Sequence, residues 1–316
     1  MTTYLVRRIA HAVIVIMGVT IVTFILQHLI ASGPRLAVAI LGPRATPGNI
    51  KAFVSEYGLN RPLPSQYLSF LWQLLHGNLG YSYKLNQSVD SILARDIPND
   101  LLLVGVALIL AIVIAIPLGI AQAARRAKPF DHATSLISFV LYSMPSFWLG
   151  LVLIELLAIN LRIFPGEAPQ GSTTQVLNNP AGLVLPIATL TLVNYSLFSR
   201  YMRSSAIDTL AQDFIRTVRA KGLSQYSVLR RHVVRNAASS TVTLIGLSFP
   251  AILVWGVAVE YVFNFPGTGL AFYSAAATGD YPLELGITFA VGIATVLGSL
   301  AADVAYAMLD PRIHYA

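Results

Sequence analysis

The side chains that could bind a ligand or a partner are concentrated in one stretch of this chain. Only 11% of its 316 residues are charged, yet residues 200–235 hold eight of the 21 lysines and arginines and only two of the 14 acidic residues. The centre of this stretch reads RTVRAKGLSQYSVLRRHVVRN, residues 216–236. A surface so rich in cations suits nucleic acid or the inner face of an anionic membrane, and the position of the charges must decide between them.

No arrangement of residues typical of a catalytic or metal site is found in the sequence. The motifs HExxH, GxSxG and GxxxxGKS/T are absent, and the six histidines show no ligand spacing. The chain has no cysteine, which excludes disulfides and thiolate metal sites. The glycines of PGTGL, residues 266–270, are too few for a dinucleotide-binding loop and predict a turn. We therefore expect no catalytic residue, no metal site and no cofactor in this chain.

The elements that must position the basic stretch are expected to be membrane-spanning helices. A hydrophobic fraction of 55% is too high for a soluble domain of this length. A helix of about 20 residues crosses a hydrocarbon core about 30 Å thick, and six stretches are long and apolar enough to do so. These stretches are residues 9–30, 101–124, 133–160, 181–199, 237–262 and 285–309. The sequence therefore predicts an all-α integral membrane protein with six transmembrane helices.

Lysine and arginine in the connecting segments predict the orientation of these helices. The N-terminal residues, the 125–132 loop and the 200–235 stretch carry two, three and eight of them, whereas the 161–180 loop has one and the 263–284 loop has none. Because cytoplasmic loops carry the excess of positive charge, we expect both termini and the basic stretch in the cytoplasm. The first apolar stretch is too long for a signal peptide and no small-residue cleavage site follows it, so we expect it to be retained.

The segment 31–100 is expected to lie on the extracytoplasmic side, between the first two transmembrane helices. Within it, QYLSFLWQLLHGNLG predicts a short amphipathic helix that ends at Gly77 and Asn78. Its apolar face is expected to hold Tyr67, Leu68, Leu71, Trp72 and Leu75. A packed cap on the helix bundle is favoured for this helix because an apolar face needs burial, and a docking surface for an extracytoplasmic partner is the alternative. The resulting division is 1–30, 31–100, and a five-helix core 101–316 that contains the loop 200–236.

The basic stretch is predicted to form two short helices around a glycine. Residues 203–221 have the apolar spacing of one helix, and Gly222 is expected to end it because glycine readily takes the left-handed C-terminal position. Ser224 is expected to cap a second helix that runs to about residue 236, with Leu223 packed on Val228. A rigid helical knob of this kind suits a cleft on another protein. Topology signalling and contact with anionic lipid are alternative roles, whereas nucleic acid is disfavoured because no stacking aromatic residues alternate with the cations.

Transport is the class of function that remains for such a chain. A carrier driven by protons or sodium ions usually places ionisable groups near the middle of the membrane, and only Glu155 and Asp303 offer thin support for that mechanism. The chain has no nucleotide-binding motif, so ATP could drive transport only through a separate subunit. An ion-coupled secondary transporter and a membrane sensor or scaffold stay open as alternatives.

Within the basic stretch, the residues resemble the coupling loop, or EAA loop, of ABC importer permeases. That loop has the pattern E-A-A-x-x-x-G; aligned on Gly222, this chain has Arg216, Thr217 and Val218 at the first three positions and keeps only the glycine. The sequence is more similar to the oligopeptide, dipeptide and nickel permease branch, in which R-T-A-R-A-K-G-L and R-H-x-x-R-N-A are usual. The corresponding stretches here are RTVRAKGL, residues 216–223, and RHVVRNA, residues 231–237.

The resemblance to this branch extends over the whole chain. The further motifs that carry it are MTTYLVRRI at the start, GLNRPLPSQY (58–67), GNLGYSY (77–83), SMPSFWLGL (143–151), VEYVFNFPGTGL (259–270), GDYPLELG (279–286) and LDPRI (309–313). It implies one of two permease subunits of an ABC importer in a cytoplasmic membrane of bacterial or archaeal type, which moves dipeptides or oligopeptides by alternating access. Nickel chelates, glutathione and other small solutes are alternative cargoes within the branch.

The resemblance also implies the partners of such a subunit. They are a second, homologous permease subunit, one or two kinds of cytoplasmic ABC ATPase that bind ATP and magnesium, an extracytoplasmic substrate-binding protein, membrane lipid and a peptide substrate, with no nucleic acid. The residues expected to couple ATP hydrolysis to transport are Arg216, Thr217, Val218, Arg219, Ala220, Lys221, Gly222, Leu223, Ser224, Arg230, Arg231 and His232.

The translocation path is expected to be lined by helices of both permease subunits. Prolines loosen helices and hydroxyl groups can face a water-filled cavity, so polar residues near prolines of the spans are candidates. These are Tyr142, Ser143 and Ser146 around Pro145, and Asn194, Ser196 and Ser248 with Pro250. Glu155 and Glu260 could attract the amino terminus of a peptide or could anchor helix ends. Hydrogen bonding between helices in a dry bundle is an equally good explanation for each polar residue.

Overall fold

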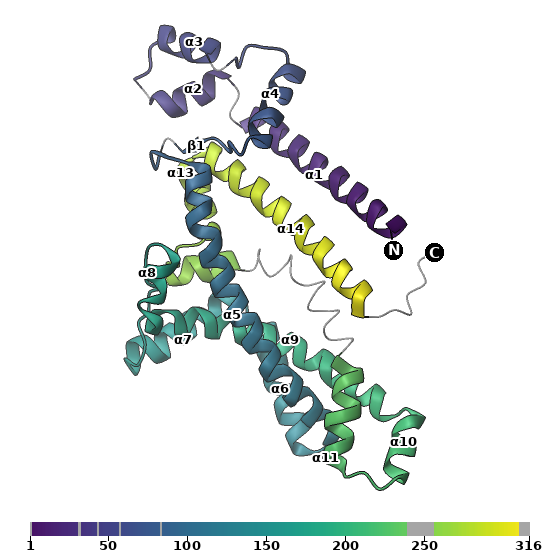
Figure 1. The fold of residues 1–316 in the computed structure, drawn as a ribbon. Helices are drawn as coiled ribbons and strands as arrows, with labels where there is room; N and C mark the ends of the chain where they lie inside the picture. Colours follow the sequence, from purple (N-terminus) through teal and green to yellow (C-terminus); the bar gives the residue numbers. More distant parts are fainter. Residues whose placement is uncertain are drawn as a thin grey trace. The chain divides into compact units, whose positions relative to one another are not determined.

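The computed structural model describes residues 2–30, 33–42, 44–56, 58–82, 84–238 and 256–309, and this part of the chain is almost entirely helical (Figure 1). The chain divides into two compact units. The first comprises Met1–Ile97 and Gly267–Leu300, and the second comprises Pro98–Pro266 and Ala301–Ala316. The long helix α5, Val89–Ala124, passes from one unit to the other at Pro98.

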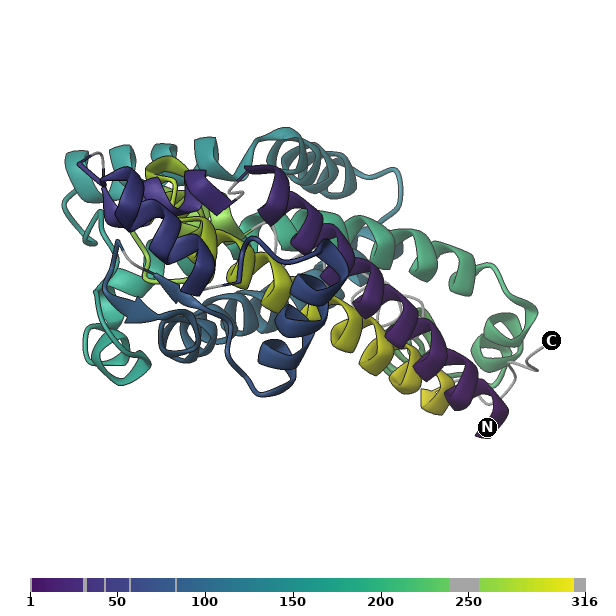
Figure 2. The same cartoon turned by 90° about the horizontal axis from the view of Figure 1, so that it is seen from above.

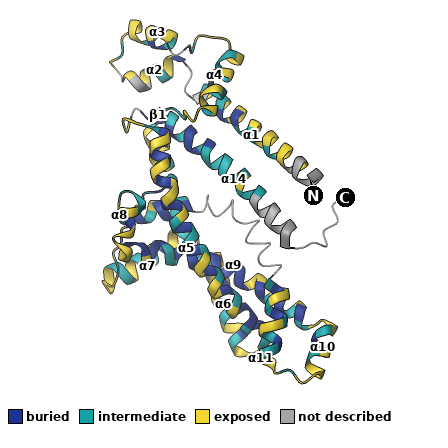
Figure 3. Ribbon diagram, in the orientation of Figure 1, coloured by how far each residue is buried: buried dark blue, intermediate teal, exposed yellow. Residues whose placement is uncertain are grey.

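The first unit contains one long helix from each end of the chain. Helix α1, Thr2–Ile30, and the part of α14, Tyr281–Leu309, up to residue 300 run side by side in both views (Figures 1 and 2). They approach closely at Gly292, where a Cβ atom would lie 2.8 Å from Cγ1 of Val19. A small residue at such a point lets two apolar helices pack at short distance in a membrane. Only 11% of the apolar window Ile9–Leu26 is buried, so most of α1 remains exposed (Figure 3).

Short helices and one hairpin form the predicted outer segment of this unit. They are α2 (Gly33–Leu41), α3 (Pro47–Glu56), α4 (Leu63–Leu75) and the antiparallel strands β1 (Tyr81–Ser82) and β2 (Gln87–Ser88). The hydroxyl of Ser82 donates to the carboxylate of Asp280, and both residues are buried. This contact fixes the hairpin to the turn between α13, Thr268–Thr278, and α14.

The predicted amphipathic helix of the outer segment is present as α4, and it stops as expected before Gly77, whose φ is +75°. Its five predicted apolar residues lie on one side of the helix, as their spacing predicts, but only part of that side is packed in the structure. The hydroxyl of Tyr67 lies 2.9 Å from Oγ1 of Thr20, and the Tyr67 ring meets the Phe24 ring edge-on with centroids 5.3 Å apart. The adjacent part of this side, with Leu68, Trp72 and Leu75, stays exposed. Helix α4 therefore packs on α1 through one edge of its apolar side and leaves the other edge exposed.

The second unit is built around α9. Its elements after α5 are α6 (Pro129–Ser143), α7 (Ser146–Leu153), the π-helical turn η1 (Ile154–Asn160), α8 (Thr173–Leu177), the 3-10 helix η2 (Pro180–Leu183), α9 (Val184–Leu210), α10 (Asp213–Ala220), α11 (Gln225–Val228) and the π-helical turn η3 (Leu229–Val233). Its larger apolar core joins Leu103 and Ala107 of α5, Phe198 of α9, and Phe263 and Phe265.

The predicted third span, 133–160, is not one straight helix. It is a pair of helices, Pro129–Ser143 and Ser146–Asn160, bent by 107°. The break follows from Pro145, because proline has no N–H to donate and its ring disfavours helical geometry in the preceding residue. Met144 accordingly has extended dihedral angles, with φ −79° and ψ 130°. The two helices form either one broken span or a re-entrant loop.

Several predicted spans correspond to helices of the structure. Among the described residues, four helices are long and apolar enough to cross a membrane, or five if the bent pair counts as one span. The four contain Ile9–Leu26, Val89–Ala124, Pro180–Leu210 and Tyr281–Leu300. Most of the predicted fifth span, 237–262, lies outside the described residues, as do Ser248 and Pro250.

Candidate functional site

The basic stretch forms a compact projection at the end of α9, which we call the basic knob and define as residues 213–236 (Figure 1). The predicted single helix 203–221 is wrong, because α9 ends at Leu210 and α10 begins at Asp213. Gln212, between them, is extended, with φ −72° and ψ 148°. The break turns α10 so that Ile215 becomes fully buried. Burial of an apolar side chain has here overridden a continuous helical pattern.

The turn inside the basic knob follows the local prediction. Gly222 has a φ of +81°, the left-handed conformation that ends α10, and nothing lies within 4 Å of the position of a Cβ. Ser224 caps α11, since its Oγ accepts a hydrogen bond from the backbone N–H of Ser227 at 3.3 Å. Glycine is needed here for its backbone conformation and not for lack of space.

An apolar cluster attaches the basic knob to two long helices. Ile215, Val228 and Val233 of the knob are fully buried in it. The other buried members are Ile120 and Ala123 of α5, Met202 and Ala206 of α9, and Ala237. Leu223 packs on the same cluster, which includes Val228, while a direct contact between the two stays a prediction. The knob is therefore held by side chains from several elements and is not a loose loop.

The predicted coupling residues divide by exposure. Those exposed to solvent are Arg216, Thr217, Arg219, Ala220, Lys221, Gly222, Ser224, Arg230 and Arg231, whereas Val218, Leu223 and His232 are half-buried. Arg216 and Asp213 form an ion pair at 3.3 Å, with side chains 80% and 93% exposed. Such an exposed pair contributes little to stability, so the knob keeps a cationic outer surface.

Tyr226 belongs to this surface and was missed at the level of sequence. It lies in the first turn of α11 with 70% of its surface exposed. The signal was present, because Tyr226 is the second residue after the Ser224 cap and lies on the helix side opposite the apolar Val228. An exposed aromatic ring among cations is typical of residues that anchor protein interfaces.

A buried ion pair braces the base of the knob. The guanidinium of Arg203 donates from Nε and Nη2 to the two carboxylate oxygens of Asp131, at 2.6 and 2.7 Å. Asp131 is 2% exposed and also accepts the backbone N–H of Ala127 at 3.0 Å. This pair therefore ties the 125–128 turn and the start of α6 to α9 within ten residues of α10. We call it the Asp131–Arg203 clamp.

Helix α5 touches α9 next to this clamp. A Cβ on Gly119 would lie 2.8 Å from Cβ of Met202 and 2.9 Å from the carbonyl oxygen of Ser199. Ser199 in turn donates to Oε1 of Gln122 at 3.3 Å. Glycine at this position permits backbone contact between the two helices, so the C-terminal parts of α5 and α9 pack closely together.

The predicted path residues lie in different environments. Tyr142 and Ser143 are exposed and Ser146 is half-buried, all near the break at Pro145. The Arg200 guanidinium carbon lies 5.0 Å from the centroid of the Tyr142 ring, which is a cation–π contact. The structure thus brings a cation of α9 onto the one aromatic residue of the predicted path set.

Asn194 and Ser196 are buried inside the second unit instead. Nδ2 of Asn194 donates to the carbonyl of Leu190 at 2.8 Å, while its Oδ1 has no hydrogen-bond partner among the described residues. Ser196 donates to the carbonyl of Val193 at 2.6 Å. Of the two acids, Glu155 is exposed and accepts from Asn160 at 3.1 Å, and Glu260 is 2% exposed. The structure does not gather these residues into one surface, and their role in a path stays a prediction.

Comparison with known proteins gives consistent results over the full length. Residues 1–104 match the N-terminal part of membrane components of binding-protein-dependent transport systems, and residues 115–315 match the inner membrane component of these systems. The chain is 34% identical over 318 residues to the oligopeptide transport system permease protein AppB of Bacillus subtilis strain 168, with 100% of both chains covered. It is 30% identical over 339 residues to the dipeptide transport system permease protein DppB of Escherichia coli K12, covering 100% of this chain and 99% of that relative.

A solved structure shares the fold. A chain of the MetNI methionine ABC transporter in an inward facing conformation matches with a TM-score of 0.56, over 69% of this chain and 96% of that chain, at 17% identity. The apolar helices, the helical knob and these matches define a membrane component of a transport system. The chain belongs to the family of inner membrane components of binding-protein-dependent transport systems.

Proposed function

We propose that this chain is one of two permease subunits of an ATP-driven importer for dipeptides or oligopeptides. Relatives over its full length are named oligopeptide and dipeptide transport permeases, and its fold is similar to that of a chain of an ABC transporter. In this proposal the chain is not catalytic. ATP and magnesium bind to cytoplasmic ATPase subunits, and an extracytoplasmic binding protein delivers the peptide.

The attachment of the basic knob is the observation that carries the mechanism. Its cations are exposed, while Ile215, Val228 and Val233 pack in one cluster with α5 and α9. Packed interiors transmit displacement because they have few voids in which to absorb it. A movement of the ATPases against the knob is therefore passed to the inner ends of α5 and α9. That motion switches the bundle between outward-open and inward-open states, as alternating access requires.

The break at Pro145 supports the proposal that the translocation path runs past the neighbouring residues. Tyr142 and Ser143 are exposed there, and Arg200 stacks on the Tyr142 ring. Arg200 directly follows the predicted span 181–199, so this contact would lie toward the cytoplasmic end of a path. We assign Tyr142, Ser143 and Ser146 to the path and leave the buried Asn194 and Ser196 to hydrogen bonding within the bundle.

The proposal is tested with the assembled transporter. This chain, the second permease, the ATPases and the binding protein are reconstituted in proteoliposomes, and uptake of labelled trialanine is measured. We expect uptake that requires both ATP and the binding protein, whereas the isolated chain hydrolyses no ATP because it has no phosphate-binding loop. Uptake that survives ATP depletion and stops with a proton or sodium ionophore would identify an ion-coupled carrier instead.

The same proposal includes the topology of the chain, with six membrane spans and both termini in the cytoplasm. Because the chain has no cysteine, single cysteines report position without background labelling. We expect an impermeant maleimide added outside the cells to label Lys84→Cys and Asn178→Cys but not Gln225→Cys, three exposed positions in the structure. Permeabilised cells serve as the control, in which all three must react. Labelling of position 225 in intact cells would place the basic knob outside and end the coupling argument.

A further inference from the structure

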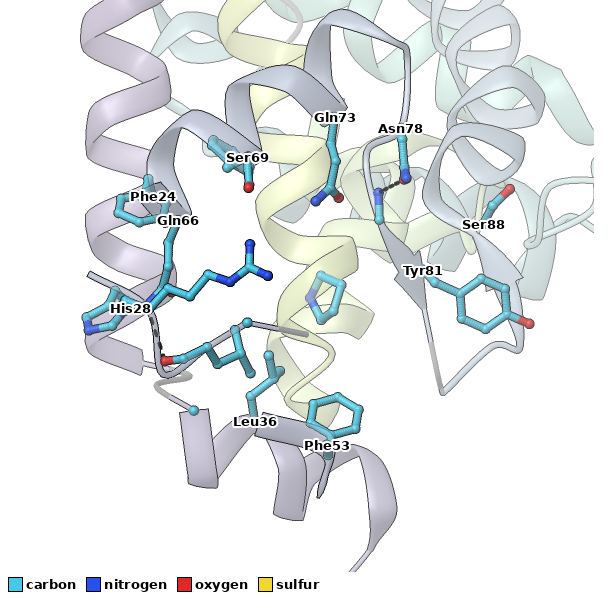
Figure 4. Close-up of a pocket in the computed structure, with 17 residues that line it drawn as sticks. Phe24, His28, Leu36, Phe53, Gln66, Ser69, Gln73, Asn78, Tyr81 and Ser88 are labelled. Atoms are coloured by element: carbon cyan, nitrogen blue, oxygen red, sulfur yellow. Dashed lines mark hydrogen bonds between the residues drawn. The ribbon is translucent and has the colours of Figure 1, made fainter. Parts of the chain in front are cut away.

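A pocket of about 610 Å³ lies within the first unit, in the segment predicted to be extracytoplasmic (Figure 4). Small-molecule sites in proteins have volumes of about 300–1,000 Å³. The walls come from the end of α1, from α2, α3 and α4, from the β1–β2 hairpin and from Pro282. None of the functions assigned above uses this space.

The pocket has one permanent charge. Among its lining residues none is Asp, Glu or Lys, and Arg61 is the only one whose side chain is always charged. Within the part of the chain that the structure describes, the Arg61 guanidinium makes no ion pair. Gly58, with a φ of +63°, lets the Arg61 side chain lie close, since a Cβ there would be 3.0 Å from Nε of Arg61. Arg61 is solvent-exposed at the wall of the pocket, and its unpaired guanidinium is free to bind an anionic ligand, for which its planar fork suits a carboxylate.

Neighbouring polar groups hold or supplement this cation. Nε2 of Gln66 donates to the carbonyl oxygens of Leu59 and Arg61, at 3.2 and 2.7 Å, and so holds the turn that carries Arg61. Ser69 and Gln73 point from α4 into the pocket (Figure 4). Neither side chain has a hydrogen-bond partner in the described residues, so a hydroxyl and an amide are available to a ligand.

The remaining walls are apolar and largely aromatic. Phe24 and Phe70 form one side, with ring centroids 5.9 Å apart. Phe53 and Leu36 of the α2–α3 pair line the pocket from the opposite side (Figure 4). Such walls bury an apolar side chain, while the guanidinium and the two free polar groups orient a charged end.

We propose that this pocket binds the C-terminal residue of a peptide, with its carboxylate on Arg61 and its apolar side chain among Phe24, Phe53 and Phe70. The inference rests on the proposed function for the class of ligand. An anionic phospholipid headgroup is the competing occupant. Headgroup sites on proteins are typically clusters of several lysines and arginines, whereas this pocket has a single cation beside aromatic rings and neutral donors. The pocket would hold peptide at the outer face, before it reaches the path near Tyr142.

The test compares a free acid with an amide. The two permeases and the ATPases are placed in phosphatidylcholine nanodiscs without the binding protein, and binding of labelled Ala-Ala-Phe is measured by equilibrium dialysis. The free acid is expected to bind about tenfold to a hundredfold more tightly than its C-terminal amide, which is the range for a hydrogen-bonded charge pair. Arg61→Gln is expected to remove this preference. Arg44→Gln, which changes the same charge in the same segment outside the pocket, is expected to keep it.

A photoreactive probe locates the site. Ala-Ala-(p-benzoylphenylalanine) is expected to cross-link to α3 or α4 in wild type and not in Arg61→Gln. Equal binding of acid and amide in wild type, a preference that survives Arg61→Gln, or cross-links elsewhere would overturn the inference. Displacement of the peptide by phosphatidylglycerol in an Arg61-dependent manner would make lipid the occupant and also overturn it. ATP-dependent peptide uptake in proteoliposomes is measured separately, so that loss of this pocket and loss of the proposed function give different results.

Discussion

Replacing Gly222 by valine is expected to reduce peptide uptake about tenfold while the chain still inserts into the membrane. Gly222 has a φ of +81°, and a β-branched residue is strongly disfavoured there, at a cost of about 1–2 kcal/mol. No atom lies within 4 Å of the new Cβ position, so the effect is conformational and not a clash. The strain changes the direction of α10 relative to α11. A tenfold loss of uptake corresponds to about 1.4 kcal/mol, which lies within this cost. Uptake and ATP hydrolysis by the reconstituted transporter are measured together, because uncoupling lowers uptake more than hydrolysis.

Gly222→Asn is the matched control for this change. Asparagine also adds a Cβ but visits the left-handed region far more readily than valine. We expect Gly222→Asn to keep most of the uptake, which separates backbone conformation from side-chain volume. Arg216→Glu is an independent probe, since it reverses an exposed charge of the knob without touching the turn. Wild-type uptake in Gly222→Val, with the ATPases still bound, would show that the turn is not the coupling element.

Replacing Asp131 by asparagine is expected to destabilise the second unit by about 3 kcal/mol. The carboxylate of Asp131 is 2% exposed and the Arg203 side chain is 31% exposed, so the variant leaves a half-buried guanidinium without its partner. The cost comes mainly from that unpaired charge. The measurement is the thermal unfolding midpoint of the detergent-solubilised chain, which should fall by several degrees.

Two variants separate this effect from a general loss of charge. Asp208→Asn changes an exposed acid of α9, the helix that carries Arg203, and Asp208 makes no ion pair among the described residues, so the midpoint should stay unchanged. The double variant Asp131→Leu with Arg203→Met removes both charges, and replacing a whole buried pair by apolar residues is often neutral or stabilising. If Asp131→Asn unfolds at the wild-type temperature, the clamp does not brace the knob.

Features governed by neighbouring residues could be predicted from the sequence. Gly222 and Ser224 act within a few residues of chain, and both have the predicted conformation and hydrogen bond. Apolar runs predicted α1, α5, α9 and α14 because the length needed to cross a membrane is a property of each segment alone. Pro145 breaks the predicted third span, whereas Pro117 lies inside α5 without ending it, so a proline alone does not locate a break.

Features governed by distant residues could not be predicted in the same way. The Asp131–Arg203 clamp joins residues 72 positions apart, and neither residue shows in the sequence which partner it has. The break after Leu210 depends on a cluster that collects Ile215 with residues of α5 and α9. The pocket around Arg61 likewise forms only when α1, the α2–α3 pair, α4 and Pro282 are in place, because each of them supplies part of its wall. Helix periodicity carries no information on any of these contacts.

The buried contact between Ser82 and Asp280 constrains the order in which the chain can mature during synthesis. Its two residues are 198 positions apart, and the core beside it joins Val89, Ile92 and Leu93 to Ala275, Leu283 and Ile287. The ribosome completes the N-terminal partners long before the C-terminal ones exist. Among the residues that the structure describes, the larger core of the second unit uses only members of 102–265, so it can form while α13 and α14 are still being made. The β1–β2 hairpin must therefore wait for the last helix before it is fixed in place. A nascent chain stopped before residue 267 lacks Ala275, Leu283 and Ile287, half of the buried residues in the core beside the hairpin.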